Sequence, residues 1–176
     1  MPDTLHDIGA RRSIRRYRRE PIPRATLEQI LTATVQAPSA KNAQPWRFVV
    51  LEGEAARYPA QVMMQRAAKL TEAGEDTGSL AWTAAVVEQA PVTILVYDAA
   101  PPAEIPAKFH ADYRFVMLQS IGGAIQTMLL AAQALGLGSL WICDVLYCED
   151  EINAWAGHTA DKLVAAVSLG WADEAP

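Results

Sequence analysis

Apolar residues along this chain form two kinds of pattern, one typical of helices and one typical of strands. Leu27, Ile30, Leu31 and Val35 lie three or four positions apart or adjacent, which predicts a helix over about residues 24–36. Short runs rich in β-branched and aromatic residues predict strands, because such side chains pack well on a pleated sheet. The predicted strands are residues 46–51, 92–97, 139–143 and 163–169. Further helical patterns predict helices over residues 4–10 (capped by Thr4), 54–73, 80–89 and 149–155.

Residues 115–135 contain no ionised side chain, and 21 residues in a helix can cross a bilayer. Three glutamines, one serine and one threonine interrupt this stretch. We therefore expect a helix buried on nearly all sides, in the core or between subunits, and no membrane span. Within it, Gly122 and Gly123 each cost about 1 kcal/mol relative to alanine in a helix interior. Close approach of another helix, or of a flat ligand, would explain the pair.

The order of these elements indicates the fold class. Two helices precede the first strand and two more precede the second, so strands and helices do not alternate regularly. An α+β arrangement, with helices packed around a modest sheet, fits this order best. The length of 176 residues suits a single domain spanning residues 1–176. Because 51% of the residues are hydrophobic, we expect some apolar surface to be buried between subunits.

The charge is unevenly distributed along the chain. Six of the fifteen basic residues lie between Arg11 and Arg19, although the net charge is −5. A compact cationic segment on an acidic body indicates a local anion, and argues against general binding of nucleic acid or membrane surfaces. Guanidinium groups bind phosphate through paired hydrogen bonds, and in an extended stretch Arg11, Ser13 and Arg15 would point to the same side. The alternatives are a solvated basic face and an adaptor for an acidic partner.

A polar loop bracketed by prolines spans residues 38–45. Asn42 and Gln44 each carry donor and acceptor atoms, which suit the edge of a ring that presents amide-like groups. Ser39 can cap or donate. An ordinary connection is equally compatible, because proline, serine and asparagine favour loops for backbone reasons alone.

The other reactive residue types form no recognisable catalytic or metal-binding pattern. His6, His110 and His158 lie in no metal or nucleophile motif. Cys143 and Cys148 are five positions apart, which matches neither a CxxC pair nor a zinc knuckle. We therefore predict no metal site, and an organic cofactor carries the chemistry if the chain is an enzyme. No basic and apolar leader begins the chain, so a cytoplasmic location is expected.

Four blocks of the sequence together resemble the nitroreductase-like flavoproteins. They are residues 11–17 (RRSIRRY), 21–23 (PIP), 37–46 (APSAKNAQPW) and 125–138 (IQTMLLAAQALGLG), in the order typical of that family. The resemblance covers nearly the whole chain. It implies a nitroreductase-like three-layer fold, in which a central, mainly antiparallel sheet is flanked by helices. It also implies a homodimer that holds FMN at the subunit interface.

The resemblance assigns twelve positions to contact with FMN. The phosphate and ribityl chain would be held by Arg11, Arg12, Ser13 and Arg15. The flavin bound mainly to the other subunit would be approached by Pro38, Ser39, Ala40 and Asn42, with Asn42 near the ring. Ser120, on the long helix, matches a position that contacts the flavin. The strand whose backbone lies against the ring, and can donate to flavin N5, would be Trp141, Ile142 and Cys143.

The activity implied by the resemblance is a ping-pong oxidoreduction. NADH or NADPH reduces the flavin and leaves, and a nitroaromatic, quinone or other conjugated acceptor takes the same place. No catalytic side chain is required. The alternatives are a non-catalytic flavin- or nucleotide-binding module, and a flavoenzyme of the same fold that performs dehalogenation or flavin fragmentation. Candidate residues for the acceptor pocket are Trp82, Phe109, His110 and Tyr113, although core packing suits the aromatic ones equally well.

One feature departs from the family pattern. Family members usually continue past the last strand with a Lys or Arg that reaches the phosphate, whereas residues 170–176 (GWADEAP) carry acids there. Phosphate binding would then depend on the amino-terminal arginines alone, and we expect reduced affinity for FMN.

Overall fold

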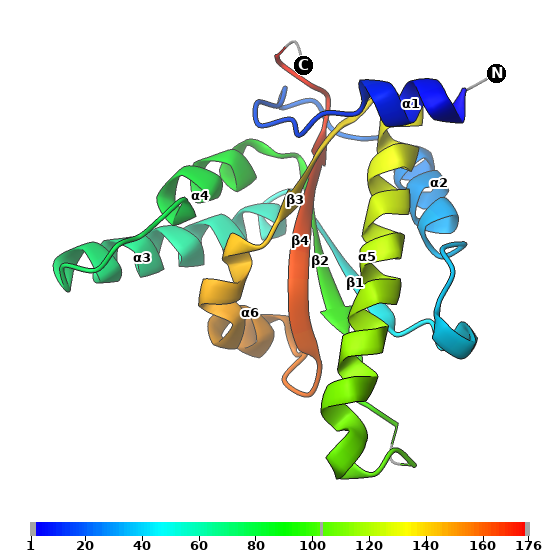
Figure 1. Ribbon diagram of the computed structural model, residues 1–176. Helices are drawn as coiled ribbons and strands as arrows, with labels where there is room; N and C mark the ends of the chain where they lie inside the picture. Colours follow the sequence, from blue (N-terminus) through cyan, green and yellow to red (C-terminus); the bar gives the residue numbers. More distant parts are fainter. Residues whose placement is uncertain (1–2, 103, 175–176) are drawn as a thin grey trace.

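A four-stranded antiparallel sheet lies between two layers of helices (Figure 1). The computed structural model describes residues 3–102 and 104–174. The strands are β1 (Trp46–Glu52), β2 (Val92–Asp98), β3 (Gly138–Ile142) and β4 (Lys162–Gly170), in the spatial order β1-β2-β4-β3. Each neighbouring pair in this order is antiparallel. The predicted α+β, three-layer fold with a mainly antiparallel sheet is confirmed.

The helices divide between the two faces of the sheet. One layer contains α1 (Thr4–Ala10), α2 (Arg24–Thr34) and α5 (His110–Ala134), and the other contains α3 (Tyr58–Glu72), α4 (Leu80–Gln89) and α6 (Glu149–Ala156). All seven residues of β2 are buried, because its alternate side chains enter two different cores. Ile94 packs in the core beneath α2 and α5, and Leu95 packs in the core beneath α3, α4 and α6.

Most predicted elements occur within two residues of their expected bounds, and three details were wrong. The helix expected over residues 54–73 starts only at Tyr58, after a 3₁₀ turn at Ala55–Arg57. Pro59 has no N–H to bond the carbonyl four residues earlier, so the regular helix cannot begin further upstream. The cap of α1 is Asp3, which accepts from the Leu5 N–H at 3.0 Å, in place of Thr4. Cys143 lies just beyond β3, not within it.

The long helix α5 crosses one face of the sheet, as expected for a core helix. Residues 107–134 are long and apolar enough to cross a membrane by length and composition alone, a test that core helices also pass. The inner face of α5 is fully packed, and its buried residues are Met117, Ser120, Ile121, Ala124, Ile125, Met128, Leu129 and Ala132. Its outer face carries exposed apolar side chains, including Phe115 at 66% exposure and Leu118 at 41%.

Candidate functional site

The arginine segment, residues 11–19, lies against the carboxyl end of β4 and the start of β3. Its Ile14 N–H donates to the Ser139 carbonyl at 3.0 Å, which forms an isolated bridge between Ser13 and Ser139. Ile14 and Tyr17 are buried, and the Tyr17 hydroxyl donates to the Ile14 carbonyl at 2.7 Å. These two side chains anchor the segment, so that most of its arginines project toward solvent.

The guanidinium groups of this segment remain available for an anion. Arg12 Nη1 donates to the carbonyls of Gly9 and Arg11 at 2.8 and 2.9 Å, where a cation suits the carboxyl end of α1. Arg15 Nη1 donates to the Ser13 carbonyl at 2.9 Å, and its guanidinium lies 5.4 Å from the centre of the Trp82 ring. Among the described residues, none of the guanidinium groups of Arg11, Arg12 and Arg15 pairs with a carboxylate. Within the described part of the chain, three guanidinium groups on one short segment therefore form no ion pair.

The carboxyl-terminal stretch runs antiparallel to this segment. The Arg18 N–H donates to the Trp171 carbonyl and the Asp173 N–H donates to the Arg16 carbonyl, both at 2.9 Å. Glu174 Oε1 then accepts from the Arg15 N–H at 2.5 Å. Asp173 and Glu174, which stand where the family usually has a base, therefore bind the backbone of the arginine segment. Burial, and then the charge of Glu174, raise the pKa of Tyr17 well above its usual range.

The end of β3 opens into a cavity beside the arginine segment. The cavity has a volume of about 180 Å³, and its lining includes Arg15, Trp82 and residues 140–144. Trp141 is 38% exposed, whereas Ile142 is buried in the core below. Burial, and then the neighbouring Asp144 carboxylate, raise the pKa of the Cys143 thiol. The arginine segment together with this strand end is called the arginine half-site.

The loop over residues 38–45 holds an unusual backbone conformation. Lys41, Asn42 and Gln44 have positive φ angles of 52°, 55° and 44°, which are uncommon for residues other than glycine. Two serine hydroxyls hold the loop in place: Ser120 Oγ accepts from the Ala40 N–H at 3.2 Å, and Ser39 Oγ accepts from the Gln44 N–H at 3.0 Å. Non-glycine residues in this conformation persist only where the surroundings enforce it, and they cluster at functional sites.

A larger apolar cavity lies beside this loop. Its volume is about 480 Å³, within the range of small-molecule sites, and its lining includes Ala40, Phe109 and Tyr113. Nε2 of His110 lies 2.8 Å from the carbonyl oxygen of Ile105. Of the four residues proposed for an acceptor pocket, Phe109 and Tyr113 line this cavity, and Trp82 lines the other one. The loop, Ser120 and this cavity are called the loop half-site.

One chain does not bring the two half-sites together, because α5 stands between them. Ser120 faces the loop, because its Oγ accepts from the Ala40 N–H. Gly122 faces the other way, since a Cβ atom built on it would lie 3.8 Å from Cη2 of Trp141. Positions two apart on a helix point about 200° apart, so the two half-sites flank opposite faces of α5. In Figure 1 the amino-terminal arginine segment lies at the top, and the short Ala40–Asn42 turn lies at the lower right.

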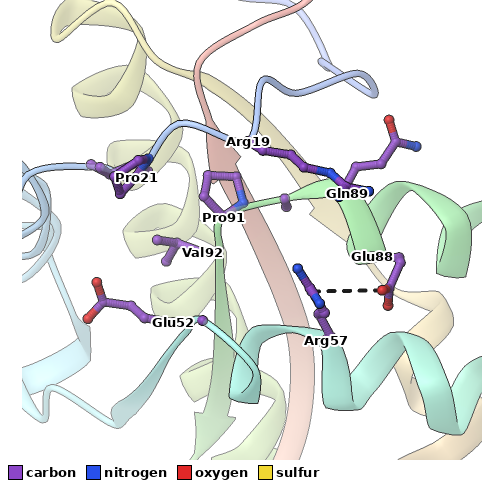
Figure 2. Close-up of a pocket in the computed structure, with 11 residues that line it drawn as sticks. Arg19, Pro21, Glu52, Arg57, Glu88, Gln89, Pro91 and Val92 are labelled. Carbon is purple, nitrogen blue, oxygen red and sulfur yellow. Dashed lines mark ion pairs between the residues drawn. The ribbon is translucent and has the colours of Figure 1, made fainter.

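A further hollow, shown in Figure 2, contains none of the twelve predicted residues. Its volume is about 200 Å³, and it lies where β1 ends and β2 begins. Arg19, Glu52, Arg57 and Glu88 are among the residues that line it, and Arg57 Nε is 3.8 Å from Glu88 Oε1. Because the charges of both signs offset each other, this hollow offers no selective site for an anion.

Comparison with known proteins identifies the family. Residues 8–171 match the sequence profile of the Nitroreductase family. The chain belongs to the nitroreductase family. Its fold agrees with that of other nitroreductases. A crystal structure of a provisionally named nitroreductase from Desulfovibrio desulfuricans, in complex with FMN, matches 99% of this chain and 88% of its own chain at a TM-score of 0.73 and 26% identity.

Two sequence relatives differ in what their names state. A Methanothermobacter thermautotrophicus protein, provisionally named NADH dehydrogenase/NAD(P)H nitroreductase, is 31% identical over 139 residues. The alignment covers 79% of this nitroreductase-family chain but only 60% of the archaeal protein, so the chain spans less than two thirds of that relative. A 5,6-dimethylbenzimidazole synthase from Rhodobacter capsulatus is 32% identical over 152 residues, which cover 82% of this chain and 72% of the synthase.

Proposed function

We propose that this protein is an FMN-dependent NAD(P)H oxidoreductase that passes electrons to a conjugated small-molecule acceptor. The observation that carries the proposal is the arginine half-site. Three guanidinium groups that have no carboxylate partner among residues 3–102 and 104–174 lie on a segment that is bonded to the start of β3. The exposed end of the same strand offers backbone groups and an apolar surface. A phosphate joined to a flat ring matches both parts.

The donor chemistry of the described residues fits FMN. Arg11, Arg12, Ser13 and Arg15 supply the charged and hydroxyl donors that a phosphate and ribityl chain require. Trp141, Ile142 and Cys143 would lie along the ring, where a backbone N–H can bond a ring nitrogen. Glu174 reduces the positive field of the segment, which supports the expected reduction in affinity for FMN.

The separation of the half-sites supports a homodimer. Pro38, Ser39, Ala40 and Asn42 belong to the loop half-site and would complete the arginine half-site of a second subunit. The second subunit would cover apolar side chains that one chain leaves exposed, among them Leu5 at 78%, Phe115 at 66% and Leu118 at 41%. Gly122 and Gly123 lie on the same open surface: the nearest side chain to Gly122 is 3.8 Å from an added Cβ, and Gly123 has no neighbour within 4 Å.

When bound, FMN supplies the hydride-transfer chemistry that amino-acid side chains lack. The chain's own part is to hold the cofactor and to admit its two substrates in turn. The apolar cavity of the loop half-site suits a flat acceptor, since Phe109, Tyr113 and Met117 line it. Ser120 positions the loop through the Ala40 N–H, and its role in flavin contact is part of the proposal. A cytoplasmic location remains a prediction.

The visible absorption of the purified protein tests the proposal. The protein as purified, or after incubation with FMN and gel filtration, should show the absorption of oxidised flavin. Addition of NADH or NADPH without oxygen should bleach it, and a quinone or nitroaromatic should restore it. A protein that retains no FMN after incubation contradicts the proposal. A protein that retains FMN but is not bleached by either nucleotide is instead a non-catalytic flavin-binding module.

The similarity to the Rhodobacter capsulatus synthase favours one alternative, a flavoenzyme of this fold that consumes its flavin. Quantification of FMN by chromatography, before and after repeated turnover in air, separates the two reactions. An oxidoreductase leaves the amount of FMN unchanged. A stoichiometric loss of FMN, with formation of a new aromatic product, supports flavin fragmentation instead.

A further inference from the structure

Asp144 joins the end of β3 to the start of α4 through two short hydrogen bonds. Ser79 Oγ donates to Asp144 Oδ2 at 2.7 Å, and Thr83 Oγ1 donates to the same oxygen at 2.5 Å. Ser79 precedes α4 and Thr83 lies one turn into it, with only 6% of its surface exposed. Hydrogen bonds to an ionised acceptor are about twice as strong as those between neutral groups. The carboxylate therefore holds two separate elements at a set distance.

These two bonds connect two walls of the cavity in the arginine half-site. Trp82 lies on α4 directly before Thr83, and the Arg15 guanidinium lies over its ring, 5.4 Å from the ring centre. On the other wall, Cys143 directly precedes Asp144 at the end of β3. Arg15, Trp82, Cys143 and Asp144 all line the same cavity of about 180 Å³. Asp144 is thus the link between the strand end, the indole ring and one of the phosphate-binding arginines.

The charge of Asp144 also acts on this cavity. Its two bonded hydroxyl groups carry no charge, and among the described residues its carboxylate forms no ion pair. The field reaches the neighbouring thiol, because the carboxylate contributes, after burial, to the raised pKa of Cys143. A fixed negative charge beside a site that gains electrons makes that gain less favourable.

We propose that Asp144 is a positioning residue of the flavin site, which sets the spacing between Trp82 and the end of β3 and lowers the reduction potential of the bound flavin. This inference rests on the proposed function for the identity of the cofactor. Sequence reasoning missed Asp144, because its partners lie 65 and 61 residues away along the chain.

Two substitutions separate position from charge. Asp144→Asn keeps a carbonyl oxygen that can accept both hydroxyl hydrogens, but it removes the charge. Asp144→Ala removes both. Titration of the apoprotein with FMN should show an affinity for Asp144→Asn within about threefold of the wild type, and a loss of about tenfold for Asp144→Ala. The midpoint potential of bound FMN should rise in Asp144→Asn. Asp150→Asn, on the exposed face of α6, is the control and should change neither quantity.

Hydrogen exchange of the apoprotein provides a measurement that needs no cofactor. Amides of residues 80–84 should exchange faster in Asp144→Ala and in the double variant Ser79→Ala, Thr83→Val, but not in Asp144→Asn. Equal exchange in all variants, or equal FMN affinity for Asp144→Ala and the wild type, overturns the positioning role. An unchanged potential in Asp144→Asn overturns the effect of charge. Failure of the wild type to bind FMN contradicts the proposed function, and the exchange data still decide the role of Asp144.

Discussion

Ile14 lies directly on Gly138, so that a Cβ atom at position 138 would fall 2.8 Å from Ile14 Cγ2. Gly170 pairs with Gly138 across β3 and β4. It leaves room for Tyr17, whose Cδ1 would be 2.8 Å from a Cβ atom added at position 170. Two paired glycines therefore make room for the two buried anchors of the arginine segment. The position of the arginine segment depends on the absence of side chains at these two places in the sheet below.

Gly138→Ala should destabilise the protein and weaken FMN binding together. The new methyl group would meet Cβ, Cγ1 and Cγ2 of Ile14, and because the backbone fixes the Cβ atom, the contact cannot be relieved without displacing the segment. Overpacking of this kind costs about 1–3 kcal/mol, measurable by urea denaturation. Gly9→Ala is the matched control, since an added Cβ there has no neighbour within 4 Å. Unchanged stability in Gly138→Ala would show that Ile14 does not anchor the segment.

Arg11→Gln and Arg15→Gln should each weaken FMN binding by about tenfold or more, because a charge-assisted hydrogen bond contributes about 1.5–3 kcal/mol. Isothermal titration with riboflavin, which lacks the phosphate, provides a second readout. The loss for Arg11→Gln should be much smaller with riboflavin than with FMN. Arg24→Gln is the control, because Arg24 pairs with Glu28 on the exposed surface of α2. An equal loss with both ligands would place Arg11 away from the phosphate.

A double substitution of Phe115→Glu and Leu118→Glu should convert the protein to monomers and abolish tight FMN binding. Both side chains lie on the exposed face of α5, where a second subunit would bury them. Size-exclusion chromatography with light scattering should give the monomer mass of 19.1 kDa for the variant and twice that mass for the wild type. Met64→Glu, on α3 in the opposite helical layer, should leave the dimer intact. A monomeric wild type that binds FMN tightly would contradict the shared site.

The two cysteines should differ in their reaction with iodoacetamide. Cys143 is exposed and Cys148 is buried, and burial raises the pKa of Cys148 to about 11. Because the thiolate is the reactive form and the pKa of Cys143 is also raised, labelling of Cys143 should be slow at pH 7 and accelerate as the pH increases. Mass spectrometry should find Cys143 labelled first. Saturation with FMN should slow this labelling; an unchanged rate would indicate that the flavin does not cover the end of β3.

Asp161 should make the folded state sensitive to acid. Burial alone would raise its pKa, but the His158 hydrogen bond, the Ala100 N–H and the Arg47 guanidinium together lower it. A carboxyl group with a lowered pKa stabilises the fold above its unfolded-state value, and this stabilisation is lost as the pH falls through the folded-state pKa. Asp161→Asn should therefore lose about 1–2 kcal/mol of unfolding free energy at pH 7 and show a smaller further loss toward pH 3 than the wild type.

The matched control for Asp161 is Asp150→Asn, because Asp150 is exposed on α6. Urea denaturation at a series of pH values provides the comparison. Parallel pH profiles for Asp161→Asn and the wild type would show that Asp161 does not account for the acid sensitivity.

Local sequence patterns were sufficient for most of the fold. Short runs rich in β-branched and aromatic residues located the strands to within a residue at each end, since such runs are a local feature of the sequence. Element starts were harder to predict. The delayed start of α3 follows from Pro59, whereas the choice of Asp3 over Thr4 as the α1 cap depends on which backbone angles the chain adopts. Short-range competition between neighbouring caps cannot be resolved from residue type alone.

The candidate site was predictable in its parts but not in its arrangement. The arginine cluster, the proline-bracketed loop and the family were all evident from residue types and their order. The resemblance also implied that the loop approaches the flavin of the other subunit. The position of α5 between the loop and the arginines, and the hydrogen bonds that Asp144 makes to Ser79 and Thr83, were not evident from the sequence. The sequence alone determined the elements, the α+β class and the chemistry available. Only the tertiary structure decided which groups meet, because those contacts join residues far apart in the chain and arise when two helical layers pack on one sheet.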